Sequence, residues 1–117
     1  MGTFSVTIEV GDPQGQVYET VEALVDTGAS YTMLPSALLQ RLGVRSTETW
    51  RFEVADDYTV EYPIGQTWIR LDGRDRMRVV VFGDSSKALL GADTLEGFGL
   101  AVDPVRKRLV RVHGLLM

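Results

Sequence analysis

The chain has 117 residues, of which 44% are hydrophobic and 24% charged, and its formal net charge is −4. A chain of this length buries one core but not two, so an active site that needs two lobes must use a second chain. The absence of cysteine excludes disulfides, thiolate nucleophiles and cysteine zinc sites. The single histidine, His113, argues against a Ser-His-Asp triad or a multi-histidine metal site, and we expect it at the surface or at a dimer interface.

Neither membrane nor nucleic-acid binding is indicated by the sequence. It contains no apolar run near the roughly 20 residues that a membrane-spanning helix needs. The first residues lack the basic, apolar and small-residue segments of a signal peptide. The negative net charge gives no reason to expect a nucleic-acid partner. We therefore expect one domain over residues 1–117 in the cytoplasm, without a metal or organic cofactor.

A β-hairpin is predicted for the first part of the chain. Residues 4–10 alternate apolar and polar side chains, as a half-buried strand does, and strand character returns over residues 17–25. Between them, residues 11–15 (Gly-Asp-Pro-Gln-Gly) have the composition of a turn. The second strand leads into Asp26, so a carboxylate stands at the end of a buried strand.

A helix is predicted for residues 33–43, where leucines share one face. Ser36 can serve as its N-cap, and Gly43 fits the position just past its end. Strand-like segments follow over residues 50–55, 58–62, 66–71, 77–82, 88–91, 100–102 and 109–112, with a helical turn at 92–96. Short strands separated by turns such as Pro63-Ile64-Gly65 favour a small β-barrel or sandwich.

Asp26 suggests chemistry only in combination with another carboxylate. Hydrolysis of a peptide without a metal, a serine triad or a cysteine needs one carboxylate that takes a proton from water and one that donates a proton. Two carboxylates about 3 Å apart share one proton and titrate as a unit. The two-fold axis of a homodimer would bring Asp26 of both chains together.

Two segments of the sequence resemble one family. Residues 23–30 (Ala-Leu-Val-Asp-Thr-Gly-Ala-Ser) are similar to the active-site segment of retropepsin-like, retroviral-type aspartic peptidases. Residues 88–95 (Ala-Leu-Leu-Gly-Ala-Asp-Thr-Leu) resemble the segment beneath the catalytic loop, and residues 98–103 are similar to bacterial members. The resemblance implies a mainly β, closed barrel-like acid-protease domain that is homodimeric. One helix follows the catalytic loop, and a short helix lies near residues 92–97.

The resemblance also implies an activity and a set of site residues. It implies an aspartic endopeptidase that hydrolyses extended peptide or protein substrates through a water activated by the Asp26 pair. In this family the glycine of the motif allows the tight loop and the threonines brace the two loops, roles that transfer to Gly28 and Thr27. Residues 52–60 would form a flap over bound substrate. The implied substrate-binding residues are Ala29, Ser30, Ala55, Asp56, Asp57 and Tyr58.

Two departures from the family pattern keep an alternative open. Retroviral enzymes usually carry aspartate where Ser30 stands, and related sequences often have glycine where Asp57 stands. The alternative function is a catalytically weak peptide-binding or dimerisation module of the same fold. We interpret Asp93-Thr94 as structural, and Trp50 and Trp68 as core or flap-packing residues. We expect residues 109–117 to form part of a dimer sheet, and we expect a set of arginines to face water: Arg70, Arg74, Arg76 and Arg78.

Overall fold

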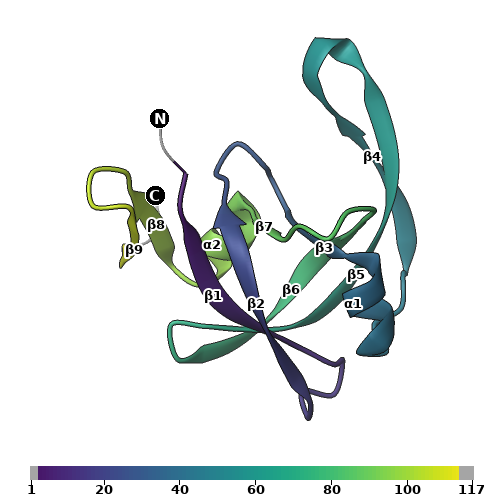
Figure 1. The fold of residues 1–117 in the computed structure, drawn as a ribbon, viewed down its shortest axis with the longest axis horizontal. Helices are drawn as coiled ribbons and strands as arrows, with labels where there is room; N and C mark the ends of the chain where they lie inside the picture. Colours follow the sequence, from purple (N-terminus) through teal and green to yellow (C-terminus); the bar gives the residue numbers. More distant parts are fainter. Residues whose placement is uncertain (1–2, 114–117) are drawn as a thin grey trace.

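The structure is a computed structural model that describes residues 3–113 (Figure 1). Residues 114–117, part of the expected dimer sheet, lie outside the described range. The strands are β1 Ser5–Gly11, β2 Tyr18–Val25, β3 Thr32–Pro35, β4 Glu48–Glu53, β5 Thr59–Leu71, β6 Arg74–Gly83, β7 Leu89–Leu90, β8 Leu100–Asp103 and β9 Arg108–Arg111. The α-helices are α1 Ser36–Arg41 and α2 Ala92–Gly97.

A single sheet closes into a barrel, which confirms the expected mainly β, barrel-like fold. The strand order is β1-β2-β7-β3-β6-β5-β4, and an additional β1–β5 pairing closes the circle. That closure joins Glu9 to Arg70 and Val10 to Ile69. β4 pairs with β5 outside the closed part, and β8 and β9 form a separate antiparallel pair.

The core lies inside the barrel and beneath the two helices. Fully buried side chains come from strands that are far apart in sequence, such as Val10, Leu34 and Leu90, and Phe98 follows α2. Each buried aliphatic side chain contributes about 1.5–3 kcal/mol relative to its exposed state. The barrel is therefore held mainly by apolar burial.

The predicted β1–β2 hairpin is confirmed, with an antiparallel register from Ser5↔Leu24 to Gly11↔Tyr18. The carboxylate of Asp12 stabilises its turn: Oδ1 accepts hydrogen bonds from the amides of Gln16 (2.7 Å) and Val17 (3.0 Å). The Val17 hydrogen bond is the main reason that the pKa of Asp12 lies below its ordinary value.

The pKa of Asp12 gives a testable prediction about this turn. Because the pKa is lowered in the folded state, the stabilisation is present above the ordinary pKa of 3.8 and is lost as pH falls through the lower folded-state value. We expect the NMR shift of the Val17 amide to titrate with a midpoint below 3.8. The shift should no longer follow this titration in Asp12→Asn, and a wild-type midpoint above 3.8 would contradict the assignment.

The helix expected over residues 33–43 is shorter, and Ser36 is not its N-cap. Residues 32–35 form β3, which pairs in parallel with β6. α1 starts at Ser36, Pro35 occupies the N-cap position, and the Ser36 hydroxyl donates to the carbonyl oxygen of Gly83 at 2.8 Å. Pairing with a buried strand therefore outweighs the local helical pattern. Gly43, just past the helix, has φ +77°, which confirms its predicted role.

The prediction of a turn at residues 63–65 is wrong, because β5 continues through these residues without a break. Pro63 pairs with Thr49 of β4, whereas the pairing with β6 begins only at Ile64↔Val81. Proline is tolerated at a position with one paired edge. A Cβ at Gly65 would lie 2.6 Å from the carbonyl oxygen of Arg45, so this glycine permits close approach rather than a turn.

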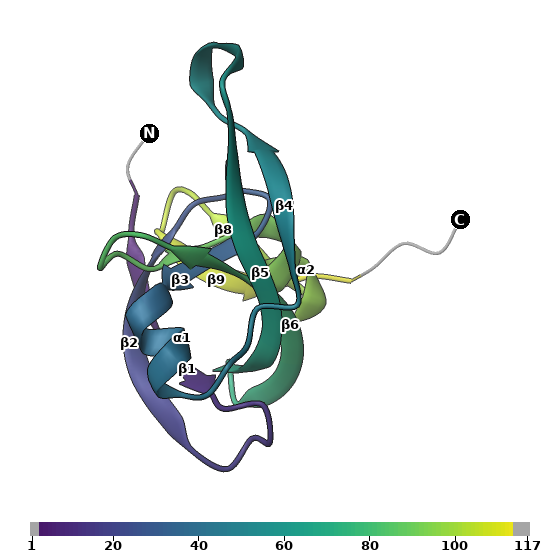
Figure 2. The same cartoon turned by 90° about the vertical axis from the view of Figure 1, so that its right-hand side faces the viewer.

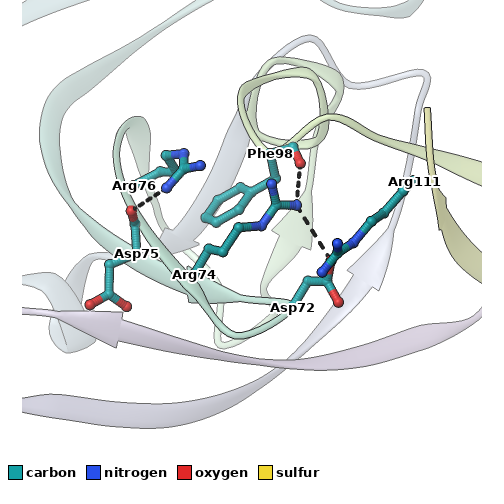
Figure 3. A network of polar contacts seen from close by, with 6 residues as sticks. All are labelled: Asp72, Arg74, Asp75, Arg76, Phe98 and Arg111. Atoms are coloured by element: carbon teal, nitrogen blue, oxygen red, sulfur yellow. Dashed lines mark hydrogen bonds and ion pairs between the residues drawn. The ribbon is translucent and has the colours of Figure 1, made fainter. Parts of the chain in front are cut away.

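Two arginines expected to face water instead dock α2 against β6. The Arg78 guanidinium donates to the Asp93 carboxylate at 2.7 Å and to the Asp93 carbonyl oxygen at 3.1 Å. Arg74 donates to the carbonyl oxygen of Phe98 at 2.5 Å (Figure 3). In the same figure Arg111 of β9 reaches Asp72 at 2.9 Å. Charged contacts thus fix both ends of α2 and join β9 to the barrel.

Candidate active site

Asp26 lies where β2 leaves the barrel and the chain turns toward β3. Its amide donates to the carbonyl oxygen of Leu90 at 3.0 Å, which continues the parallel pairing of β2 with β7. Its own carbonyl oxygen accepts a hydrogen bond from the Ala29 amide at 3.1 Å, closing the loop. Asp26 therefore stands at the end of a strand, as the sequence predicted, and that strand is buried only at Ala23 and Val25, next to Asp26.

The Asp26 side chain is oriented by the glycine of the same motif. The Gly28 amide donates to Asp26 Oδ1 at 3.0 Å. A Cβ at Gly28 would lie 3.2 Å from this oxygen, closer than nearly all ordinary contacts of a Cβ atom. Glycine thus allows the amide and the carboxylate to approach. Asp26 is half-buried, while Thr27 and Gly28 are exposed beside it.

The loop after Asp26 is supported from below by the start of α2. The amides of Ala92 and Asp93 donate to the carbonyl oxygens of Ala29 and Ser30, both at 2.8 Å. Beneath them the buried hydroxyls of Thr32 and Thr94 are hydrogen bonded to each other at 2.5 Å. These contacts confirm the structural interpretation of Asp93-Thr94. They fix the loop backbone without using any side chain of the loop itself.

A groove of about 470 Å³ separates the loop of residues 26–31, which we call the Asp26 loop, from the β4–β5 hairpin. Its lining residues are Gly28, Ala29, Ser30, Tyr31, Met33, Arg51, Phe52, Glu53, Val54, Val60, Tyr62, Val81 and Leu89. Ala29 and Ser30, two of the expected substrate-binding residues, thus line it. The hairpin extends away from the barrel in both views (Figures 1 and 2).

The four other expected substrate-binding residues occupy the tip of the hairpin, outside the groove lining. Ala55, Asp56 and Asp57 form a tight turn, and Tyr58 is 69% exposed. Asp56 and Asp57 have φ values of 65° and 63°, in the left-handed region that favours glycine and that aspartate tolerates. Contact of these residues with substrate stays a prediction.

Most of the apolar groove residues were not predicted as site residues. On the hairpin, Phe52 and Val60 are cross-strand partners, and Tyr62 lies on the same face. The alternation of these residues with charged neighbours was the available signal. On the barrel, Met33, Val81 and Leu89 come from three different strands, and no local pattern links them.

A second hollow of about 400 Å³ lies on the other side of Asp26. It is lined by Thr3, Phe4, Val25, Asp26, Thr27, Gly28, Val102 and Pro104. Among the described residues that line the two hollows, Glu53 of β4 is the only carboxylate besides Asp26. The described part of one chain therefore supplies a single aspartate to this loop.

Residues 3–113 contain no group of three or more His, Cys, Asp or Glu side chains placed to hold a metal ion. Within the same range, no helix has the length and apolar character needed to cross a membrane.

The fold is that of the retroviral proteases. The solution structure of simian foamy virus (mac) protease has a TM-score of 0.58 and 18% identity, covering 80% of this chain and 92% of that chain. EIAV protease complexed with the inhibitor HBY-793 has a TM-score of 0.61 and 20% identity, covering 84% of this chain and 89% of that chain. At these identities the likeness shows the fold alone.

Residues 16–97 match the family described as "gag-polyprotein putative aspartyl protease". This range covers more than half of the chain, and the chain belongs to this retroviral-type aspartyl protease family. The matched range contains both the Asp26 loop and the Gly91 segment that supports it. A search of the curated proteins finds no match. The expected family is thus confirmed, and similarity to its bacterial members stays a prediction.

Proposed function

We propose that the chain is an aspartic endopeptidase whose active site forms on the two-fold axis of a homodimer from Asp26 of both chains. One observation carries the proposal: Asp26 is held by backbone hydrogen bonds between two hollows, with no aspartate beside it in the described residues. Membership of the aspartyl protease family supports the hydrolase class. An isologous dimer supplies the missing carboxylate by symmetry.

In this mechanism the two Asp26 carboxyl groups share one proton. The ionised carboxylate takes a proton from a water molecule as its oxygen attacks the scissile carbonyl carbon, and the protonated carboxyl donates to the carbonyl oxygen. Transfer of a proton to the amide nitrogen then allows the tetrahedral intermediate to break down. The Gly28 amide holds Asp26 Oδ1 in place during these transfers.

The groove supports an extended peptide as the substrate. Its floor is the Asp26 loop, and its roof is the β4–β5 hairpin. Over Thr59–Pro63 the described pairing of β5 is with β4 alone, so the other edge of the strand is open to hydrogen bonding with an extended chain. A peptide bound in this way would place its backbone beside Asp26.

Mixing wild type with Asp26→Asn tests the shared active site directly. At constant total concentration and after subunit exchange, a 1:1 mixture is expected to retain about a quarter of the wild-type peptidase activity, because only wild-type pairs carry both carboxylates. Retention of half the activity would show that each chain acts alone and would contradict the proposal. Peptide affinity without cleavage by pure wild type would favour the binding-module alternative.

A further inference from the structure

An aromatic cluster joins the Asp26 loop to the β4–β5 hairpin. The ring centroids of Tyr31 and Trp50 are 5.3 Å apart with an interplanar angle of 67°, and those of Tyr31 and Phe52 are 6.4 Å apart at 69°. Both contacts are edge-to-face, the geometry that aromatic pairs prefer. Phe52 also packs against Tyr62 of β5 at 6.3 Å. We call Tyr31, Trp50, Phe52 and Tyr62 the aromatic clamp.

Tyr31 is the member of the clamp that is fixed to the barrel. A Cβ at Gly91 would lie 2.5 Å from the carbonyl carbon and oxygen of Tyr31, so the two backbones are in close contact. On either side of Tyr31, the Ser30 carbonyl oxygen accepts a hydrogen bond from the Asp93 amide, and Thr32 is fully buried. The position of the Tyr31 ring therefore follows that of the Asp26 loop.

The hairpin has little other support near the groove. From Thr49↔Pro63 to Glu53↔Thr59 the described strand pairing is internal to the hairpin. Pairing of β5 with the barrel strand β6 begins only at Ile64. From Ile64 toward the tip of the hairpin, the side chains on the inner face set the distance between the hairpin and Asp26.

We propose that Tyr31 is a positioning residue that holds the hairpin over Asp26 through Trp50 and Phe52. Opening of the groove then involves residues 53–59, which lie beyond the clamp, while the part of the hairpin below Phe52 stays in place. The catalytic consequence rests on the proposed peptidase function. The clamp itself can be tested in protein that has no activity.

Hydrogen exchange and kinetics of matched variants test the clamp. In Tyr31→Ala we expect amide exchange over residues 48–53 and 59–63 to become about tenfold faster, with barrel peptides unchanged. We expect kcat/KM to fall about tenfold, mainly through a higher KM. Tyr31→Phe keeps the ring and should stay within about twofold of wild type in both measurements.

Two further variants separate positioning from other roles of Tyr31. Trp50 contacts Tyr31 but is not among the groove-lining residues, so Trp50→Ala should reproduce both effects. Tyr18→Ala removes a half-buried tyrosine from the other end of the barrel, where its ring packs under Arg70. This variant should leave amide exchange in the β4–β5 hairpin unchanged.

Three results would overturn the inference. The first is unchanged hairpin exchange in Tyr31→Ala, and the second is faster exchange throughout the chain, which indicates general loss of stability. The third is a raised KM in Tyr31→Ala that Trp50→Ala does not share, which would assign Tyr31 to direct substrate contact. If wild type cleaves no peptide, the proposed function fails, but the exchange measurements still decide whether the clamp exists.

Discussion

Peptide cleavage is expected to fall by about 10³-fold or more in Asp26→Asn, because the amide can neither accept a proton from water nor donate one as a carboxyl group does. The measurement is mass spectrometry of a diverse peptide mixture incubated with wild type and variant. Asparagine has nearly the same shape and can still accept the hydrogen bond from the Gly28 amide, so we expect the fold to be retained.

Asp84→Asn is the matched control for this prediction. Asp84 is exposed in the loop after β6, away from both hollows that flank Asp26, and its replacement changes the net charge by the same amount. Cleavage by this variant should equal that of wild type. Activity of Asp26→Asn within about tenfold of the control would rule out the aspartic mechanism, provided that both variants melt cooperatively.

Gly91→Ala is expected to destabilise the protein by about 3 kcal/mol, the upper end of the usual cost of overpacking, because the new methyl group has no space. A Cβ there would lie 2.5 Å from the Tyr31 carbonyl group and 2.9 Å from the carbonyl oxygen of Ala29, and both are backbone atoms. The Asp26 loop would have to move away from α2 to make room. Urea unfolding followed by circular dichroism measures the loss of stability.

Gly83→Ala provides a comparison at a site of similar crowding but different flexibility. A Cβ at Gly83 would meet the Met33 side chain at 2.7 Å, and a methionine side chain can adopt another rotamer. We expect it to cost less than half as much as Gly91→Ala. Equal losses would show that tight backbone contact beneath the Asp26 loop is not a special constraint.

Local patterns predicted the elements that short-range physics determines. Alternation predicted the β1–β2 hairpin, and Gly43 marked the end of α1, because neither depends on distant partners. Parallel strand β3 was assigned to the helix, since its pairing with β6 is set by residues almost 50 positions away. Pro63 and Gly65 were interpreted as a turn because the features that allow them inside a strand are also non-local. Pro63 has a paired strand on one side only, and Gly65 lies against the carbonyl oxygen of Arg45.

The candidate site divides in the same way. Asp26, Thr27 and Gly28 are adjacent in sequence and carry a motif, so they could be predicted. The groove walls combine side chains from the loop, the hairpin and three barrel strands, and only the closed barrel brings them together. The half-buried positions of Arg74 and Arg78 depend on the docking of α2, which strand alternation cannot reveal.

The support beneath the Asp26 loop also bears on the order of folding. Asp26 and Ala29 are hydrogen bonded to Leu90 and Ala92, and Thr32 to Thr94, so the loop is held in place by residues that are far away in sequence. Such contacts form late, because the chain between them must first be ordered. During synthesis, the loop stays without its support until α2 has left the ribosome. A nascent chain is therefore expected to lack a fixed Asp26 loop until α2 has been made.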